Sequence, residues 1–168
     1  MIYDFNADAV FEMAEHIEKN GAKFYRNAAR RVTTPGIREM LLRLAAMEDE
    51  HQKTFAEFRK KLSASERQPL MAGIDPDIQK YLKALADTRV FHHKKKPNVA
   101  ISETHTEIDI IEDIYRSAIR AEKDSIVFYA GIREMVPEAF GKSKIDDIIK
   151  EEMGHITTLS VELAGVNK

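Results

Sequence analysis

Apolar side chains recur every three or four residues in four long stretches of the chain, and one long interval lacks this pattern. Such spacing places the apolar residues on one face of an α-helix. It predicts helices over about 7–32, from Pro35 to about 62, from just after Thr106 to about 136, and across 145–163. The third of these has its apolar positions at Ile108, Ile111, Tyr115, Ala118, Ile119, Ile126 and Ile132.

Short breaks divide the four predicted helices into two hairpins. Asn6 is a candidate N-cap of the first helix, and Thr34 followed by Pro35 is typical of the start of the second. Thr106 is placed to cap the third helix, and Pro137 marks a turn before the fourth. Because both turns are short, the helices that they join are expected to be antiparallel neighbours.

The interval 63–105 predicts a long crossover between the hairpins, with one short helix that Asp75 caps and Pro76 begins. A connection of this length can run back along a bundle. The pattern therefore predicts an all-α fold, an antiparallel four-helix bundle with one crossover, in which the third helix runs parallel to the second. A chain of 168 residues suits a single domain over 1–168.

Six polar residues share the apolar faces of these helices, although an unpaired buried carboxylate costs several kcal/mol or becomes protonated. They are Glu18, Glu48, His51, Glu122, Glu152 and His155. In each Glu-x-x-His pair, a step of three residues places the two side chains about 60° apart and about one turn along the helix. Both side chains of a pair can therefore reach one ion.

An internal repeat relates the two hairpins, because an offset of 104 residues matches four positions in each. The pairs are Glu18 with Glu122, Tyr25 with Tyr129, Glu48 with Glu152, and His51 with His155. The repeat matches Glu152, and not Glu151, to Glu48. Glu15 and Glu50 have no acidic counterparts in the second hairpin. A shared register of this kind indicates two copies of one structural unit.

Two such hairpins bring together four carboxylates and two imidazoles, a ligand set that suits two metal ions. Glutamate oxygens can bridge ions about 3.5–4 Å apart, and Glu48 and Glu152 are the expected bridges. Two divalent ions also neutralise four carboxylates, which offsets the cost of burial. The set favours iron or manganese over zinc. The alternative interpretations are a metal-free polar network, or helices rotated so that these residues face solvent.

The composition narrows the chemistry further. With 0 Cys, the chain has no disulfides, thiolate metal sites or thiol catalysis. Its 26 basic and 28 acidic residues give a net charge of −2, which argues against nucleic acid or anionic lipid as a partner. The acidic N-terminal segment is unlike a signal peptide, and no apolar run approaches the roughly 18 residues of a membrane span. We expect a cytoplasmic protein.

The repeated pattern resembles the rubrerythrin branch of the ferritin-like superfamily, and the resemblance covers nearly the whole chain except 63–105. The residues that carry it are Glu18…Tyr25…Glu48-Asp49-Glu50-His51 and Glu122…Tyr129…Glu152-Met153-Gly154-His155. It implies an oxo- or carboxylate-bridged di-iron site, peroxide reduction, an antiparallel four-helix bundle of ferritin-like type and often a homodimer. It also implies that Tyr25 and Tyr129 hydrogen-bond ligand glutamates, with simple packing as the alternative.

The chain differs from that family in two respects that change the expectations. Rubrerythrins usually carry a cysteine-rich rubredoxin domain that delivers electrons, which a chain with 0 Cys cannot contain, so an external electron donor is expected. They also carry an extra glutamate at the position of Ser125. Without it the iron cannot exchange a histidine for that glutamate, and slower turnover is expected. Asp49 stands where haem-binding ferritins have a methionine, so no haem is expected.

The sequence therefore predicts a di-iron redox protein that reduces hydrogen peroxide, or dioxygen, with electrons from a separate donor. Two other functions stay open at this point. One is iron oxidation and storage in a shell of many subunits, and the other is a scaffold that holds metal only for stability.

Overall fold

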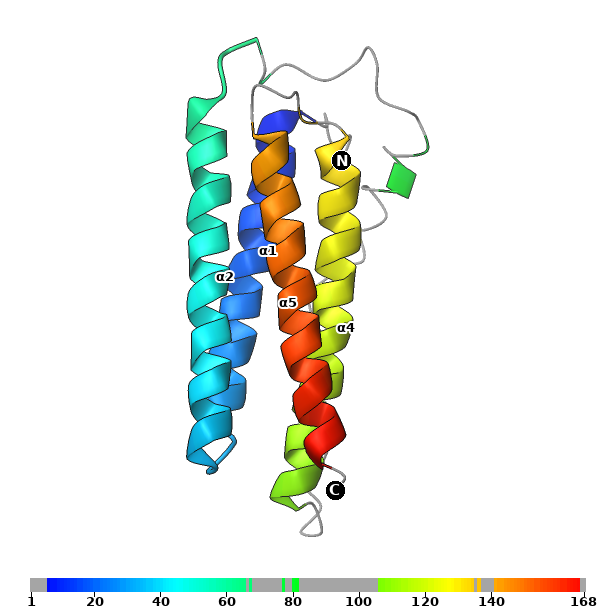
Figure 1. Cartoon of the computed structure of the whole chain (residues 1–168). Helices are drawn as coiled ribbons and strands as arrows, with labels where there is room; N and C mark the ends of the chain where they lie inside the picture. The colour runs from blue at the N-terminus through cyan, green and yellow to red at the C-terminus, as the bar shows by residue number, and fades with distance from the viewer. Residues whose placement is uncertain are drawn as a thin grey trace.

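The computed structural model describes residues 6–65, 67, 77, 80, 81, 106–134, 136 and 141–166. Most of these lie in four long helices, α1 (Ala7–Ala29), α2 (Pro35–Lys61), α4 (Glu107–Arg133) and α5 (Lys142–Val166). α1 packs against α2, α4 packs against α5, and α1 also contacts α4. In Figure 1 α2 and α4 run in one direction, and α1 and α5 in the other. The predicted antiparallel bundle, with its third helix parallel to the second, is confirmed.

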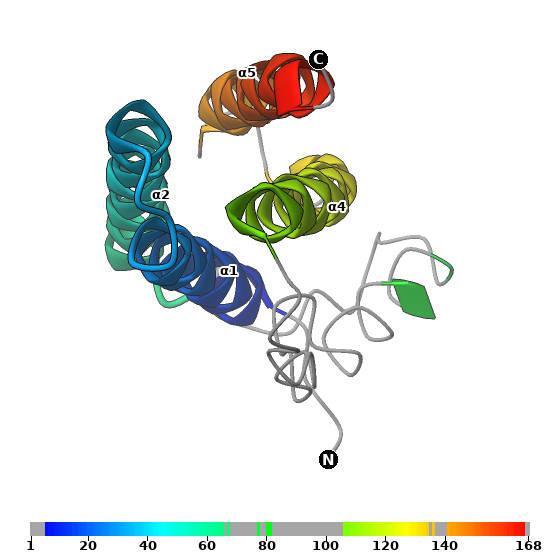
Figure 2. The same ribbon diagram turned by 90° about the horizontal axis from the view of Figure 1, so that it is seen from below.

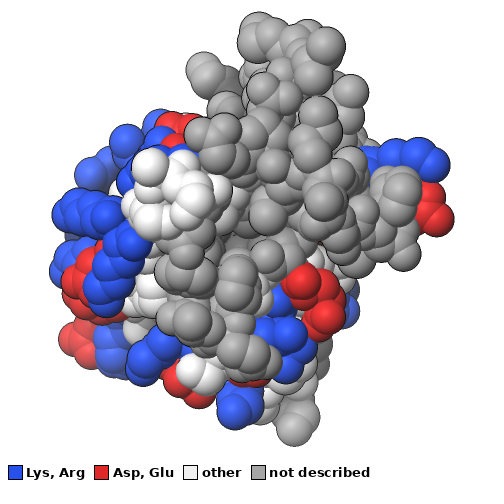
Figure 3. Space-filling model, turned by 90° about the horizontal axis from the view of Figure 1, so that it is seen from above, with Lys and Arg blue, Asp and Glu red and all other residues white. Residues whose placement is uncertain are grey.

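The four helices occupy the corners of the bundle when it is seen along its length (Figure 2). α1 lies beside α2 and α4, and α5 lies beside α4 and diagonal to α1. At the end of the bundle shown in Figure 3, basic and acidic side chains are mixed on the described surface. No helix among the described residues is long and apolar enough to cross a membrane.

Side-chain caps fix where two of the helices begin. The Asn6 side chain accepts a hydrogen bond of 2.8 Å from the Ala9 N–H at the start of α1. Thr106 and Asp109 form a reciprocal capping box at the start of α4. Both predicted caps are confirmed.

Thr34 occupies the N-cap position of α2 and Pro35 begins the helix, as predicted, but the Thr34 side chain makes no capping hydrogen bond. Its hydroxyl instead lies 3.4 Å from Glu107 Oε1. The same carboxylate accepts a hydrogen bond of 2.6 Å from the Thr33 hydroxyl, and others from the backbone N–H groups of Thr33, at 2.6 Å, and Thr34, at 3.1 Å. These bonds hold the pKa of Glu107 below its usual value and tie the α1–α2 turn to the start of α4.

Two helices end earlier than the sequence predicts. α1 ends at Ala29, because the Arg31 N–H bonds to the Ala28 carbonyl at 2.9 Å in a tighter turn, and α4 ends at Arg133. Ile108 is predicted on the apolar face but is 56% exposed, and Ile111 is the first buried isoleucine of α4. Asp75, Pro76 and Pro137 lie outside the described residues, whereas residues 77, 80 and 81 of the short helix predicted there are described and helical.

The core has two apolar clusters with a polar layer between them. One cluster includes Phe11, Phe55 and Tyr129, and the other includes Tyr25 and Tyr115. The buried polar side chains of the layer come from all four helices. They are Glu18, Glu48, His51, Glu122, Ser125, Glu152 and His155.

Candidate metal centre

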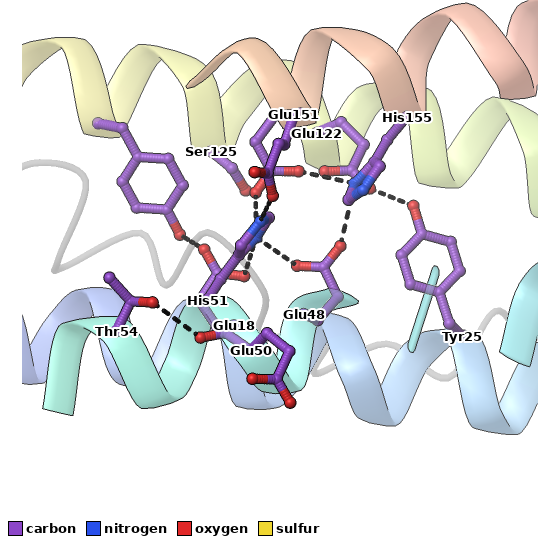
Figure 4. A network of polar contacts seen from close by, with 12 residues as sticks. Glu18, Tyr25, Glu48, Glu50, His51, Thr54, Glu122, Ser125, Glu151 and His155 are labelled. Carbon is purple, nitrogen blue, oxygen red and sulfur yellow. Dashed lines mark hydrogen bonds and ion pairs between the residues drawn. The ribbon is translucent and has the colours of Figure 1, made fainter. Parts of the chain in front are cut away.

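All six side chains predicted as ligands meet in this polar layer, and none is more than 3% exposed. Figure 4 shows Glu18, Glu48 and His51 from α1 and α2 facing Glu122 and His155 from α4 and α5. The helices place them there because each residue occupies the same face as the apolar residues of its own helix. The interpretation in which these residues face solvent is therefore wrong.

The ligand atoms form two overlapping groups, in each of which all atoms lie within 4.8 Å of one another. The first group is Glu18, Glu48, His51 and Glu152, and the second is Glu48, Glu122, Glu152 and His155. Glu48 and Glu152 belong to both groups, and the other four residues belong to one each. This arrangement is the one that two ions with two bridging carboxylates require.

Both histidines direct Nδ1 into the centre. His51 Nδ1 lies 3.1 Å from Glu152 Oε1 and 3.6 Å from Glu18 Oε2. His155 Nδ1 lies 2.8 Å from Glu152 Oε2 and 3.3 Å from Glu48 Oε1. The two rings are nearly parallel, with their centres 5.9 Å apart. Each imidazole therefore offers Nδ1 as its metal-binding atom.

Several ligand-residue atoms of the centre lack a hydrogen-bond partner within the described part of the chain. They are Glu18 Oε2, Glu48 Oε1, both carboxylate oxygens of Glu152, Nδ1 of His51 and both ring nitrogens of His155. Unsatisfied buried polar atoms are rare in folded proteins, and each one calls for an explanation. Coordination to two divalent ions satisfies the carboxylate and Nδ1 lone pairs together, so the residues present fit a dinuclear metal site.

Burial and close packing of charge perturb the ligand pKa values. Burial raises the pKa of Glu18 well above its usual value, and it raises the pKa of Glu122 to about 7. Burial on its own lowers the pKa of His51, but its contacts with Glu152 and Glu18 raise it to about 11. The same competition raises the pKa of His155 to about 12. An ion that binds here must therefore displace protons.

Each of the two repeated tyrosines reaches a carboxylate of the opposite hairpin. The Tyr25 hydroxyl donates to Glu122 Oε1, and the Tyr129 hydroxyl donates to Glu18 Oε1. Burial raises the pKa of both tyrosines well above the usual value, so both remain hydrogen-bond donors. Glu18 and Glu122 each belong to only one of the two ligand groups, and one tyrosine hydroxyl holds each of them in place.

Small residues lie one turn along from Glu18 and Glu122. A Cβ atom at Gly21 would lie only 3.2 Å from Glu48 Oε2, so glycine leaves room for that carboxylate. Its repeat counterpart, Ser125, is buried, and its hydroxyl donates to the Ala121 carbonyl at 3.1 Å. Neither residue adds a carboxylate to the centre.

The structure adds Glu151, a residue that the repeat excluded. Its Oε2 lies 2.7 Å from His51 Nε2, on the outer side of the imidazole ring. Helical periodicity offers no signal for this contact, because Glu151 is exposed on α5 and reaches across to α2. A cavity of about 390 Å³ opens here between the two helices. It is lined by Glu50, His51, Thr54, Lys144, Asp147, Ile148, Lys150 and Glu151.

The acidic neighbours that the repeat set aside lie outside the centre. Glu50 is exposed and pairs with Lys53 at 2.5 Å, and Glu15 lies 3.7 Å from Arg59.

Comparisons with known proteins identify one matching family and one similar solved structure. The Rubrerythrin family model matches residues 10–163. Among solved structures, a candidate ferritin-like diiron-carboxylate protein from Thermotoga maritima has a similar fold, with a TM-score of 0.68. It is 20% identical in sequence, and the alignment covers 95% of both chains. No curated protein matches the chain.

Proposed function

The chain belongs to the rubrerythrin family, and from that premise we propose that it is a di-iron redox protein that reduces hydrogen peroxide with electrons from a separate donor. The observation that carries the proposal is the pair of overlapping ligand groups that share Glu48 and Glu152. A shared pair of carboxylates supports a dinuclear centre, and a dinuclear centre suits a reaction that moves two electrons at once.

Two ferrous ions bound by these residues would supply the redox chemistry, since together they would provide the two electrons that reduction of peroxide to water requires. The protein supplies geometry and shielding. Glu48 and Glu152 hold the two metal positions close together, and the tyrosine hydroxyls fix the orientation of Glu18 and Glu122. The two apolar clusters on either side exclude bulk water from the polar layer.

Access and electron supply follow from the surroundings of the centre. The cavity between α2 and α5 reaches His51, so it offers a small oxidant a path to the first ligand group. The chain has 0 Cys and thus no cysteine-ligated iron of its own to deliver electrons. We therefore propose that a separate donor re-reduces the centre after each turnover.

Rapid mixing of the anaerobic diferrous protein with oxidant tests this function. We expect about one equivalent of peroxide per di-iron site to oxidise the protein faster than air-saturated buffer does. The near-ultraviolet absorbance of the ferric product measures the rate. Faster oxidation by dioxygen would assign the centre to iron oxidation, and no reaction with either oxidant would indicate a metal-stabilised scaffold. Glu15→Ala, which changes a residue beside Arg59 outside the centre and the cavity, should react as the unmodified protein does.

A further inference from the structure

The two histidines of the centre differ at the ring nitrogen that points away from it. His51 Nε2 lies 2.7 Å from Glu151 Oε2. His155 Nε2 is also buried, yet it has no hydrogen-bond partner in the part of the chain that the structure describes. The ligands of the two hairpins match, but among the described residues only the His51 imidazole has a carboxylate behind it.

The internal repeat explains the difference. Glu151 reaches from the second hairpin to His51 of the first, so its counterpart is the residue 104 positions earlier, which is Met47. Met47 is 38% exposed, and its thioether is only a weak hydrogen-bond acceptor. The sequence therefore provides the carboxylate on one side of the pseudo-two-fold axis and not on the other.

Glu151 is available to His51 because the nearby cations have another partner. Lys144 and Lys150 line the same cavity, and both lie within 4.0 Å of the Asp147 carboxylate. Glu151 and the ligand Glu152 are consecutive on α5, so their side chains leave the helix in directions about 100° apart. One enters the centre while the other reaches the back of the His51 ring, as Figure 4 shows for Glu151.

We propose that Glu151 is a positioning residue that makes the two metal positions unequal. It accepts the Nε2–H of His51, which fixes the ring and leaves the Nδ1 lone pair directed at the ion. The position that contains His51 therefore binds its ion first and more tightly than the position that contains His155. This inference depends on the dinuclear centre proposed above, but not on which oxidant it reduces.

Titration of Co²⁺ into the metal-free protein tests the inference. Calorimetry measures the binding steps, and the visible ligand-field absorption of the bound ion reports its coordination. We expect two separate binding steps for the unmodified chain. Glu151→Ala should weaken the tighter step by about 10- to 100-fold, so that the two steps merge. Glu151→Gln should lose less affinity, because its amide oxygen still accepts the Nε2–H.

Two further variants separate positioning from general damage to the fold. Met47→Glu should supply the missing carboxylate behind His155 and tighten the weaker step. Glu50→Ala removes a carboxylate from the same cavity wall and should leave both steps unchanged. Glu151→Gln keeps an acceptor for the Nε2–H, so this variant should melt close to the temperature of the unmodified metal-free protein.

Two equal steps in the unmodified chain, or an unchanged tight step in Glu151→Ala, would overturn this inference while leaving the dinuclear centre intact. A chain that binds fewer than two Co²⁺ ions would instead overturn the dinuclear centre, and this inference with it.

Discussion

The two halves of the metal centre have the same ligands and different surroundings. The half built from α1 and α2 contributes Glu18, Glu48 and His51, and the repeat supplies the same residue types from α4 and α5. Behind the two histidines the match ends. Glu151 contacts His51 from outside, and no described residue hydrogen-bonds to the equivalent nitrogen of His155.

This difference distinguishes residues that bind the metal from residues that hold those ligands in position. Two ions of one kind need the same donor atoms at similar distances, so the ligands of the two halves match. The outer residues set how firmly each ligand is held, and they can differ without changing which metal fits. The symmetric residues therefore indicate what the centre binds, and the asymmetric ones indicate how unequally it binds.

The largest expected effect distinguishes shared ligands from unshared ones. Glu48→Ala and Glu152→Ala each remove a residue that belongs to both ligand groups, so each should lose both ions. Glu18→Ala and Glu122→Ala each disturb one group and should retain one ion. Metal analysis after gel filtration measures the content, with Glu15→Ala and Glu50→Ala as controls that keep two ions. If Glu48→Ala behaved like Glu18→Ala, the shared role would be wrong.

Metal loading should raise the melting temperature, and the gain should grow with pH. Burial alone lowers the pKa of His51 and His155, but the surrounding carboxylates raise these pKa values to about 11 and about 12. Because both exceed the usual histidine value of about 6.5, this contribution to metal-free stability falls as pH rises above about 6.5. Competition between protons and the ion falls over the same range, so binding tightens.

Melting curves of metal-free and Mn²⁺-loaded protein at pH 6, 7 and 8 measure this gain. At a free ion concentration of about 100 times Kd, one ion adds about 2.7 kcal/mol, which corresponds to roughly 5–10 °C for a chain of this size. A gain that stays constant or shrinks from pH 6 to 8 would contradict the assignment of the protons to the ligands.

The tyrosine pair tests whether the two halves are equivalent where the structure shows them to match. Tyr25→Phe and Tyr129→Phe each remove a hydroxyl that donates to a buried carboxylate of the other hairpin. Each should lower the free energy of unfolding by about 1.5–3 kcal/mol, and by similar amounts, in urea denaturation. Tyr115→Phe is the control, because the Tyr115 hydroxyl is buried without a hydrogen-bond partner in the described part. Similar losses in all three variants would indicate packing alone.

Glycine substitutions give the smallest expected effect and test the space beside Glu48. Gly154→Ala should stabilise α5 by up to about 1 kcal/mol, because nothing lies within 4 Å of the added Cβ. Gly21→Ala should not show this gain, since its Cβ would lie 3.2 Å from Glu48 Oε2. It should also weaken metal binding, whereas Ser125→Ala on the other half should not. Equal stabilisation by Gly21→Ala and Gly154→Ala, measured in urea, would show that Glu48 has room to move.

The fold and the convergence of the six polar residues could be predicted because two independent regularities apply to the same residues. Helical periodicity selects the faces, and the repeat selects between neighbours such as Glu151 and Glu152. The helix ends were less accurate. Val32 and Val136 are buried as the pattern indicates, but the chain has already left the helical conformation before each of them.

The contact between Glu151 and His51 could not be predicted from either regularity. Glu151 is exposed, so the apolar pattern gives no sign of it, and the repeat argues against it because Met47 is its counterpart. The contact depends on how α2 and α5 lie across the cavity, which only the folded bundle determines. Thr34 is a similar case, since it occupies the predicted N-cap position but its hydroxyl contacts Glu107 of α4 and does not cap α2.

The central claim is that six side chains from two matching hairpins hold two metal ions in one core. A crystal structure of the iron-loaded protein, with anomalous diffraction recorded on both sides of the iron edge, tests it most directly. The account predicts two iron peaks within the polar layer, one near His51 and one near His155, with Glu48 and Glu152 bound to both. A single peak, or iron bound elsewhere while these six residues remain hydrogen-bonded only to one another, would contradict it.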